Sequence, residues 1–169
     1  INQGIQNYMI NVALFGFGRI GQMHAENLCK NKEIKLLYVY EKLNKLTKKA
    51  KNLYNCKIEK DYNKIFKDKK VDIIFISSPT NTHIKFIEEG IKAKKTIFCE
   101  KPLDLDINKI INTLKKVKKF KPKIQLGFNR RYDPGHHSIK KELYKNKIGK
   151  LEKIIITSRD PAPPSISYL

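Results

Sequence analysis

The sequence lacks tryptophan, and it contains little cysteine and little negative charge. Of its 169 residues, 16 are acidic and 36 are basic, which gives a formal net charge of +20. The three cysteines, Cys29, Cys56 and Cys99, are widely spaced and form no C-x-x-C or metal-ligand pattern. An odd number without such a pattern argues against a disulfide framework or a metal site, and it favours reduced thiols in a cytoplasmic protein.

Long hydrophobic segments are also missing. The longest unbroken apolar run extends only from Leu36 to Tyr40, whereas a membrane-spanning helix needs about 20 apolar residues. Hydrophobic residues make up 40% of the chain and charged residues 31%, which excludes a disordered or fibrous protein. The length favours roughly one domain, and it is sufficient to bury a substantial core.

Arginine is scarce, because only four of the 36 basic residues are arginine and the others are lysine. Proteins that bind nucleic acids usually rely on arginine for bidentate contacts. The lysines are spread over almost every segment, so we interpret them as a solvent-facing surface. A basic nucleic-acid-binding module remains an alternative, and it would show binding that weakens steeply with salt.

Short apolar runs alternate with amphipathic, lysine-rich segments. The runs are β-branched or aromatic, which is typical of buried strands, and they cover residues 10–15, 36–40, 71–77, 96–99 and 124–128, with a weaker strand at 56–58. Helical spacing predicts helices over residues 20–28, 61–69, 81–94 and 107–117. This alternation predicts an α/β fold of the Rossmann type, a doubly wound parallel sheet with helices on both faces.

The clearest motif is a G-x-G-x-x-G sequence over residues 16–21. It follows a predicted strand and opens a predicted helix, which is the context of a dinucleotide-binding site. Gly16 permits a tight turn, Gly18 lets the backbone approach a pyrophosphate, and Gly21 allows close packing. The motif residues predicted to bind the cofactor are Gly16, Phe17, Gly18, Arg19, Ile20 and Gly21.

An acidic residue follows the second predicted strand. Glu41 lies 20 positions after Gly21, where a carboxylate hydrogen-bonds the ribose hydroxyls and repels a 2′-phosphate. This favours NAD over NADP as the cofactor. The neighbouring Lys42 weakens that preference, because a cation there tolerates a phosphate.

Two polar loops follow later strands, at the sheet edge where ligands bind in such folds. They are S-P-T-N-T-H at residues 78–83 and E-K-P at residues 100–102. With the glycine motif and G-F-N-R-R-Y-D-P at residues 127–134, they have the order and spacing of the Gfo/Idh/MocA oxidoreductases, which residues 9–169 resemble. The T-S-R-D-P-A-P-P stretch at residues 157–164 is similar to the inositol dehydrogenase branch of that family.

The resemblance implies an NAD-dependent enzyme in which the nicotinamide takes a hydride from a carbinol carbon of a cyclic polyol or sugar. It makes Lys101 the active-site lysine, which relays the hydroxyl proton, and the Lys101–Pro102 bond is often cis in relatives. Further cofactor-binding residues implied in this way are Ser78, Pro79, Thr80, Asn81, His83, Glu100 and Lys101. The implied substrate-binding residues are Lys101, Asn129, Arg130 and Asp160. Another sugar or scyllo-inositol dehydrogenase of the family, or a non-catalytic NAD-binding module, remains an alternative.

Other basic side chains have less specific interpretations. We expect His83 to fix its loop near the nicotinamide and His24 to decorate the first helix. His136 and His137 are expected to be exposed at a helix start over residues 135–147. For Arg131, a surface ion pair and a site role are equally compatible with the sequence.

The pattern predicts three regions. Residues 1–8 are expected to be an extension without fixed structure, because Met9 directly precedes the first strand. Residues 9–128 are expected to form the NAD-binding domain, and residues 129–169 the opening of an α+β substrate domain, with a strand over residues 151–158. In the family, an Asp and a His that act with the lysine come from a later segment, so we expect this chain to have little activity and the full-length protein to be a homo-oligomer.

Overall fold

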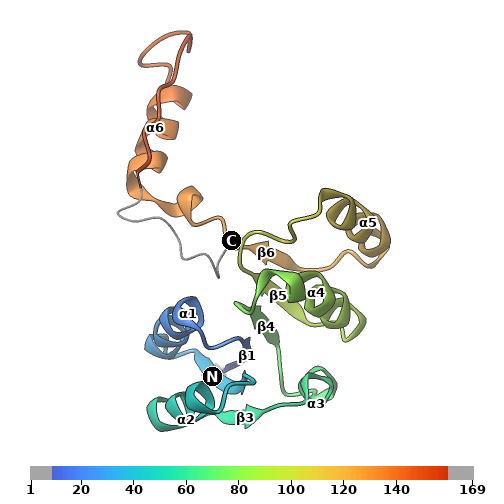
Figure 1. Ribbon diagram of the computed structural model, residues 1–169. Helices are drawn as coiled ribbons and strands as arrows, with labels where there is room; N and C mark the ends of the chain where they lie inside the picture. Colours follow the sequence, from blue (N-terminus) through green and yellow to red (C-terminus); the bar gives the residue numbers. More distant parts are fainter. Residues whose placement is uncertain (1–8, 160–169) are drawn as a thin grey trace, which may run out of the picture. The chain divides into compact units, whose positions relative to one another are not determined.

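The computed structural model describes residues 9–159, and these residues contain a six-stranded parallel sheet (Figure 1). The strands are β1 (Ile10–Phe15), β2 (Ile34–Tyr40), β3 (Lys57–Glu59), β4 (Ile73–Ile76), β5 (Thr96–Cys99) and β6 (Ile124–Leu126). Their order is β3-β2-β1-β4-β5-β6, and every neighbouring pair is parallel. This is the Rossmann order, in which the chain reverses its direction of winding between β1 and β4. The predicted fold class is confirmed.

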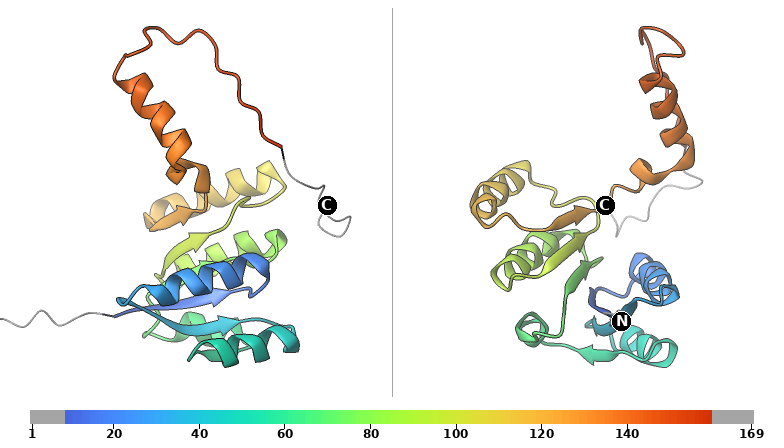
Figure 2. Two further views of the ribbon diagram at one scale, coloured as in Figure 1. Left: turned by 90° about the vertical axis from the view of Figure 1, so that its left-hand side faces the viewer. Right: turned by 180° about the vertical axis from the view of Figure 1, so that it is seen from behind.

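Helices cover both faces of the sheet (Figures 1 and 2). They are α1 (Arg19–Lys30), α2 (Asn44–Leu53), α3 (Tyr62–Lys67), α4 (His83–Lys92) and α5 (Ile107–Val117), with 3-10 turns η1 (Thr80–Thr82) and η2 (Lys118–Phe120). Helices α1 and α2 pack on one face, and α3, α4 and α5 pack on the other. The sequence pattern does not predict α2, because its fully buried residues are the small Thr47 and Ala50 and only Leu46 packs beside them as a larger apolar side chain.

The core lies on both sides of β1, since alternate residues of a strand point to opposite faces. Ala13 and Phe15 belong to the cluster with α3, α4 and α5, whereas Val12 and Leu14 belong to the cluster with α1 and α2. All four side chains are fully buried. Burial on both faces explains why the sequence shows nearly continuous apolar runs instead of strict alternation.

The lysines follow the predicted surface pattern. Among the lysines of residues 9–159, all are exposed except Lys95, which is partly buried. Its Nζ donates to the carbonyls of Asp68 and Val71, both at 2.7 Å, and burial lowers the pKa of this amine. Within the described part of the chain, no helix is long and apolar enough to cross a membrane.

A second unit begins after Phe128, and it is described by itself. It contains η3 (Asn129–Tyr132) and α6 (Pro134–Tyr144). The carboxylate of Asp133 caps α6 by accepting from the His136 N–H at 3.0 Å. The His136 side chain lies 2.9 Å from the same oxygen, and these hydrogen bonds lower the pKa of Asp133 to about 2. As predicted, His136 and His137 are exposed near the start of this helix.

The strand predicted over residues 151–158 is wrong. Residues 151–159 form no strand, and Ile154, Ile155 and Ile156 are all exposed. A strand is stabilised by a neighbour that pairs with its N–H and C=O groups. The described part of the chain supplies no such neighbour for this segment. The predicted extension over residues 1–8 lies outside the described residues.

The buried Cys99 thiol generates a prediction. Burial raises its pKa from 9.0 to about 12, so it carries about a thousandfold less of the reactive thiolate than an ordinary thiol does. Cys29 is exposed. In native protein, a thiol reagent is therefore expected to label Cys29 first and to leave Cys99 unlabelled until denaturant is added, as peptide mass spectrometry after timed labelling checks. Cys29→Ser is the control that removes the fast phase, and native labelling of Cys99 would contradict the burial.

Candidate functional site

The candidate site lies at the carboxyl edge of the sheet, where hydrogen bonds continue the pairing one residue beyond the strands. The donors are the N–H groups of Gly16, Ser77, Glu100 and Gly127, and the acceptors are the carbonyls of Tyr40, Phe15, Ile76 and Cys99, at 2.8–2.9 Å. The predicted loops therefore start from fixed backbone positions on both sides of the reversal between β1 and β4. In open α/β sheets this crevice is where ligands bind.

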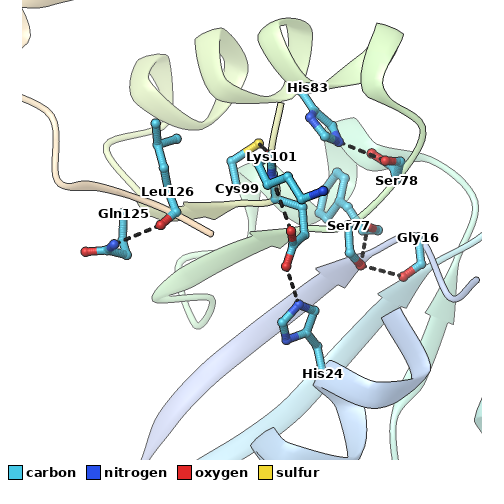
Figure 3. A network of polar contacts seen from close by, with 11 residues as sticks. Gly16, His24, Ser77, Ser78, His83, Cys99, Lys101, Gln125 and Leu126 are labelled. Carbon is cyan, nitrogen blue, oxygen red and sulfur yellow. Dashed lines mark hydrogen bonds and ion pairs between the residues drawn. The ribbon is translucent and has the colours of Figure 1, made fainter. Parts of the chain in front are cut away.

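The glycine motif forms a tight turn without room for side chains. Gly16 has φ +90°, and a Cβ atom there would lie 2.6 Å from the Cα atom of Ser78. A Cβ atom on Gly21 would lie 2.2 Å from the carbonyl oxygen of Gly16. The Ser77 hydroxyl donates to that same carbonyl at 3.1 Å (Figure 3). The tight turn predicted at Gly16 and the close packing predicted at Gly21 therefore correspond to backbone contacts that leave no room for a Cβ atom.

Gly18 is different, because a Cβ atom there would meet nothing within 4 Å. It is the N-cap residue of α1, and no described side chain caps this helix. By contrast, α3, α5 and α6 are capped by the aspartates Asp61, Asp106 and Asp133. Uncapped N–H groups and the positive end of the helix dipole form a favourable site for a phosphate. The first turn of α1, including the exposed Arg19 and the half-buried Ile20, therefore fits a dinucleotide pyrophosphate.

Glu41 holds the glycine motif to the end of β2. One carboxylate oxygen accepts from the Phe17 N–H at 2.9 Å, and the other accepts from the N–H groups of Lys42 and Leu43 at 2.7 and 3.0 Å. The Phe17 side chain is fully buried, and its ring packs edge-on against Tyr54 with centroids 6.1 Å apart. Phe17 therefore presents only its backbone to a ligand, and the Glu41 carboxylate lies beside the motif.

The S-P-T-N-T-H loop follows β4 and leads through η1 into α4. The hydroxyls of Ser78 and Thr82 lie 2.6 Å apart, and the Thr82 hydroxyl donates to the Pro79 carbonyl at 2.7 Å. Pro79 and Asn81 are exposed, and Thr80 is half-buried. The hydrogen bonds stay within the loop and on the backbone, so the outer side chains are available to a ligand.

His83 ties this loop to the E-K-P turn. Its side chain is buried, with Nδ1 2.7 Å from the Pro102 carbonyl oxygen and Nε2 2.8 Å from that of Ser78. Each ring nitrogen of His83 thus lies at hydrogen-bond distance from a backbone carbonyl oxygen, one in each of the two loops. His83 is thus the link between the two predicted loops.

Lys101 lies at the turn after β5, and its peptide bond to Pro102 is cis, as the resemblance implies. Its side chain is exposed. Its backbone N–H donates to the Glu100 carboxylate at 3.2 Å, and the other oxygen of that carboxylate lies 2.7 Å from Nε2 of His24. The expectation that His24 merely decorates α1 is wrong, because its side chain is only 16% exposed and packs against Phe75. Sequence reasoning missed this contact because 76 positions separate the two partners.

Of the predicted substrate residues, only Lys101 belongs to the unit that contains the sheet. Asn129, Arg130 and Arg131 belong to the second unit and are exposed. The guanidinium of Arg130 lies 3.6 Å from the Asp133 carboxylate. Asp160 lies outside the described residues.

Comparison with known proteins identifies the family of the chain. A family model described as an oxidoreductase family with an NAD-binding Rossmann fold, GFO_IDH_MocA, matches residues 10–128. The chain belongs to the Gfo/Idh/MocA oxidoreductase family. Its glycine motif, S-P-T-N-T-H loop and E-K-P turn all lie within the matched residues.

Several relatives of this Gfo/Idh/MocA protein are named as inositol dehydrogenases. The inositol 2-dehydrogenase of Rhizobium meliloti is 36% identical over 160 residues, which cover 95% of this chain and 48% of that protein. The structure of a myo-inositol dehydrogenase from Corynebacterium glutamicum has a TM-score of 0.87 at 34% identity, covering 95% of this chain and 48% of its own. A scyllo-inositol dehydrogenase from Lactobacillus casei with bound NAD(H) and scyllo-inositol has a TM-score of 0.77 at 32% identity, with 83% and 42% covered. The chain therefore spans about half the length of the relatives it matches.

The two glycines with opposite surroundings give a matched pair of variants. Gly21→Ala places a methyl group against the Gly16 carbonyl, and we expect it to lower the free energy of unfolding by about 1–3 kcal/mol. Gly18→Ala enters open space and is expected to cost less than about 1 kcal/mol. Urea unfolding followed by circular dichroism measures both. Equal stability of the two variants would contradict the close contact at Gly21.

Proposed function

We propose that this chain is the cofactor-binding part of an NAD-dependent dehydrogenase of the inositol 2-dehydrogenase type, which oxidises a ring carbinol of a cyclic polyol. The observation that carries the proposal is the meeting of three elements at one sheet edge. The uncapped start of α1, the Glu41 carboxylate and the turn at Lys101 follow β1, β2 and β5, so they flank the reversal between β1 and β4 at the carboxyl edge of the sheet. Inositol dehydrogenases among the relatives support the polyol as substrate.

Each group of site residues has a role that follows from its chemistry. The N–H groups at Gly18, Arg19 and Ile20 bind the pyrophosphate, and Glu41 accepts hydrogen bonds from the ribose hydroxyls. NAD, when bound, supplies the hydride acceptor. The Lys101 amine lies at the turn beyond β5, and it takes the hydroxyl proton of the substrate or relays it.

Residues of the S-P-T-N-T-H loop and the second unit complete the proposal. Ser78, Pro79, Thr80, Asn81, His83 and Glu100 shape the nicotinamide side of the site. Asn129, Arg130 and Asp160 contribute hydrogen-bonding groups to the polyol, because a ring of hydroxyls requires polar partners. We assign residues 9–128 to the cofactor domain and residues 129–169 to the start of an α+β substrate domain. A substrate panel of inositols and sugars, run on the full-length protein, distinguishes the substrates.

We also propose a cellular compartment and an oligomeric state for the whole protein. The three cysteines are free thiols, which suits a reducing cytoplasm. The whole protein is a homo-oligomer. Because the chain spans about half the length of its relatives, we expect it to bind NAD without appreciable turnover.

Calorimetric titration of the chain with NAD tests the cofactor assignment. Wild-type protein is expected to release heat on binding, and Gly18→Ala is expected to weaken binding at least about tenfold, because its methyl group blocks the approach of the pyrophosphate. The variant's urea midpoint serves as the control for folding. A well-folded wild-type chain that binds no NAD would refute the cofactor assignment.

The charge of Glu41 is expected to set the preference for NAD over NADP. Glu41→Gln keeps one side-chain oxygen, which can accept from the Phe17 N–H or from the Lys42 and Leu43 N–H groups but not from both sides. It removes the negative charge that repels a 2′-phosphate. We expect the ratio of the NADP to the NAD dissociation constant to fall about tenfold. Glu59→Gln is the matched control, since Glu59 ends β3 and also accepts from two following N–H groups. An unchanged ratio in Glu41→Gln would show that the carboxylate does not discriminate.

A further inference from the structure

The turn that carries Lys101 has a support that the proposed function does not use. Glu100, directly before Lys101, has a carboxylate that is 19% exposed and held from two sides. One oxygen lies 2.7 Å from Nε2 of His24, and the other accepts the Lys101 N–H at 3.2 Å. An ionised carboxylate only accepts hydrogen bonds, so Nε2 of His24 carries the proton of this contact. His24 and the Lys101 backbone are thus joined through one side chain.

The surroundings fix both partners of this contact. The His24 ring lies 4.6 Å from the ring of Phe75 and 5.6 Å from that of Phe98, measured between centroids, and these two rings stack on each other at 4.0 Å. On the other side, a Cβ atom on Gly127 would lie 3.0 Å from the Glu100 carboxylate. The absence of a side chain at Gly127 leaves the space that the carboxylate fills.

The contact also spans the two halves of the fold. His24 belongs to α1, which follows β1, whereas Glu100 follows β5 on the other side of the reversal. Figure 3 shows His24 reaching from α1 toward the turn that carries Lys101. The same helix begins at Arg19, with Gly18 as its N-cap. One helix therefore carries both the start of the candidate phosphate site and the His24 contact to the lysine turn.

Lysine needs such a support more than other catalytic side chains do. Its side chain has four rotatable bonds and loses much rotamer freedom when it is ordered. The protein fixes Lys101 at its root, where His83 holds the Pro102 carbonyl and Glu100 holds the Lys101 N–H. We propose that His24 is a positioning residue that orients the Lys101 turn through the Glu100 carboxylate. The significance of this role rests on the proposed function, but the contact can be tested without it.

The test uses a pair of variants that differ by one methylene group. The amide of His24→Gln reaches about as far as the imidazole Nε2 atom and keeps an N–H donor, whereas the shorter His24→Asn does not reach Glu100. Nuclear magnetic resonance of the ¹⁵N-labelled chain reports the Lys101 amide proton, and Glu100→Ala gives its position without a carboxylate acceptor. Met23→Leu, at an exposed position of the same helix, is the control. Urea unfolding of every variant reports the general loss of stability.

We expect the Lys101 amide signal of His24→Asn to move toward its position in Glu100→Ala and its hydrogen exchange to become about tenfold faster, as expected when a charge-assisted hydrogen bond loses its fixed acceptor. His24→Gln is expected to restore the wild-type signal. A merely structural role would lower stability without this selective shift and rescue. If His24→Asn does not fold, His24→Leu, which fills the space between the aromatic rings, replaces it. A Lys101 signal that stays at its wild-type position would overturn the proposal.

Titration with NAD tests whether the contact between His24 and Glu100 affects cofactor binding. We expect the NAD dissociation constant to rise about tenfold in His24→Asn and to return in His24→Gln. An unchanged constant in His24→Asn overturns the role in cofactor binding. If the wild-type chain binds no NAD, the proposed function fails, whereas the Lys101 amide signal still decides whether His24 orients the turn.

Discussion

The backbone contact between the glycine motif and the end of β4 is the constraint on which the rest of the site depends. Gly16, Gly21 and the Ser77–Ser78 segment meet with no room for a Cβ atom. This contact fixes where α1 starts and in which direction it runs over the sheet. The direction of α1 in turn places His24 beside Glu100. A contact between backbones at one end of the helix therefore decides which side chains meet in its middle.

The sequence predicts the parts of the fold whose signal is local. Strands buried on both faces appear as continuous apolar runs, and β5 begins and ends where the pattern predicts. Helix α2 is missed because its buried side chains are small. The strand predicted over residues 151–158 fails for a different reason, since the described chain offers it no partner to pair with. An apolar run indicates that a segment suits a strand, but a neighbour decides whether it becomes one.

The site also combines contacts that are local in sequence, which can be predicted, with contacts between distant segments, which cannot. The crowding at Gly16 and Gly21 is predictable because it depends on positions close in sequence around one strand-helix-strand unit. The contact between the Glu41 carboxylate and the Phe17 N–H is not part of the sequence prediction. The contacts of His83 with the Pro102 carbonyl and of His24 with Glu100 join distant segments, and no spacing rule reveals them. His83 is buried and His24 is half-buried, but a sequence pattern cannot distinguish them from exposed histidines such as His137. The net charge of +20 is similarly uninformative about the site, because the lysines are solvated.

The buried Phe17 has a consequence for the thermodynamics of ligand binding. Its ring anchors the glycine motif in the core beside Tyr54, and its N–H is held by Glu41. The loop therefore loses its conformational entropy when the protein folds, and little remains to be lost when a dinucleotide arrives. Preorganisation of this kind raises affinity without adding a contact to the ligand. A phosphate loop with its own hydrophobic anchor thus links the strength of binding to the packing of a buried side chain that lies away from the ligand.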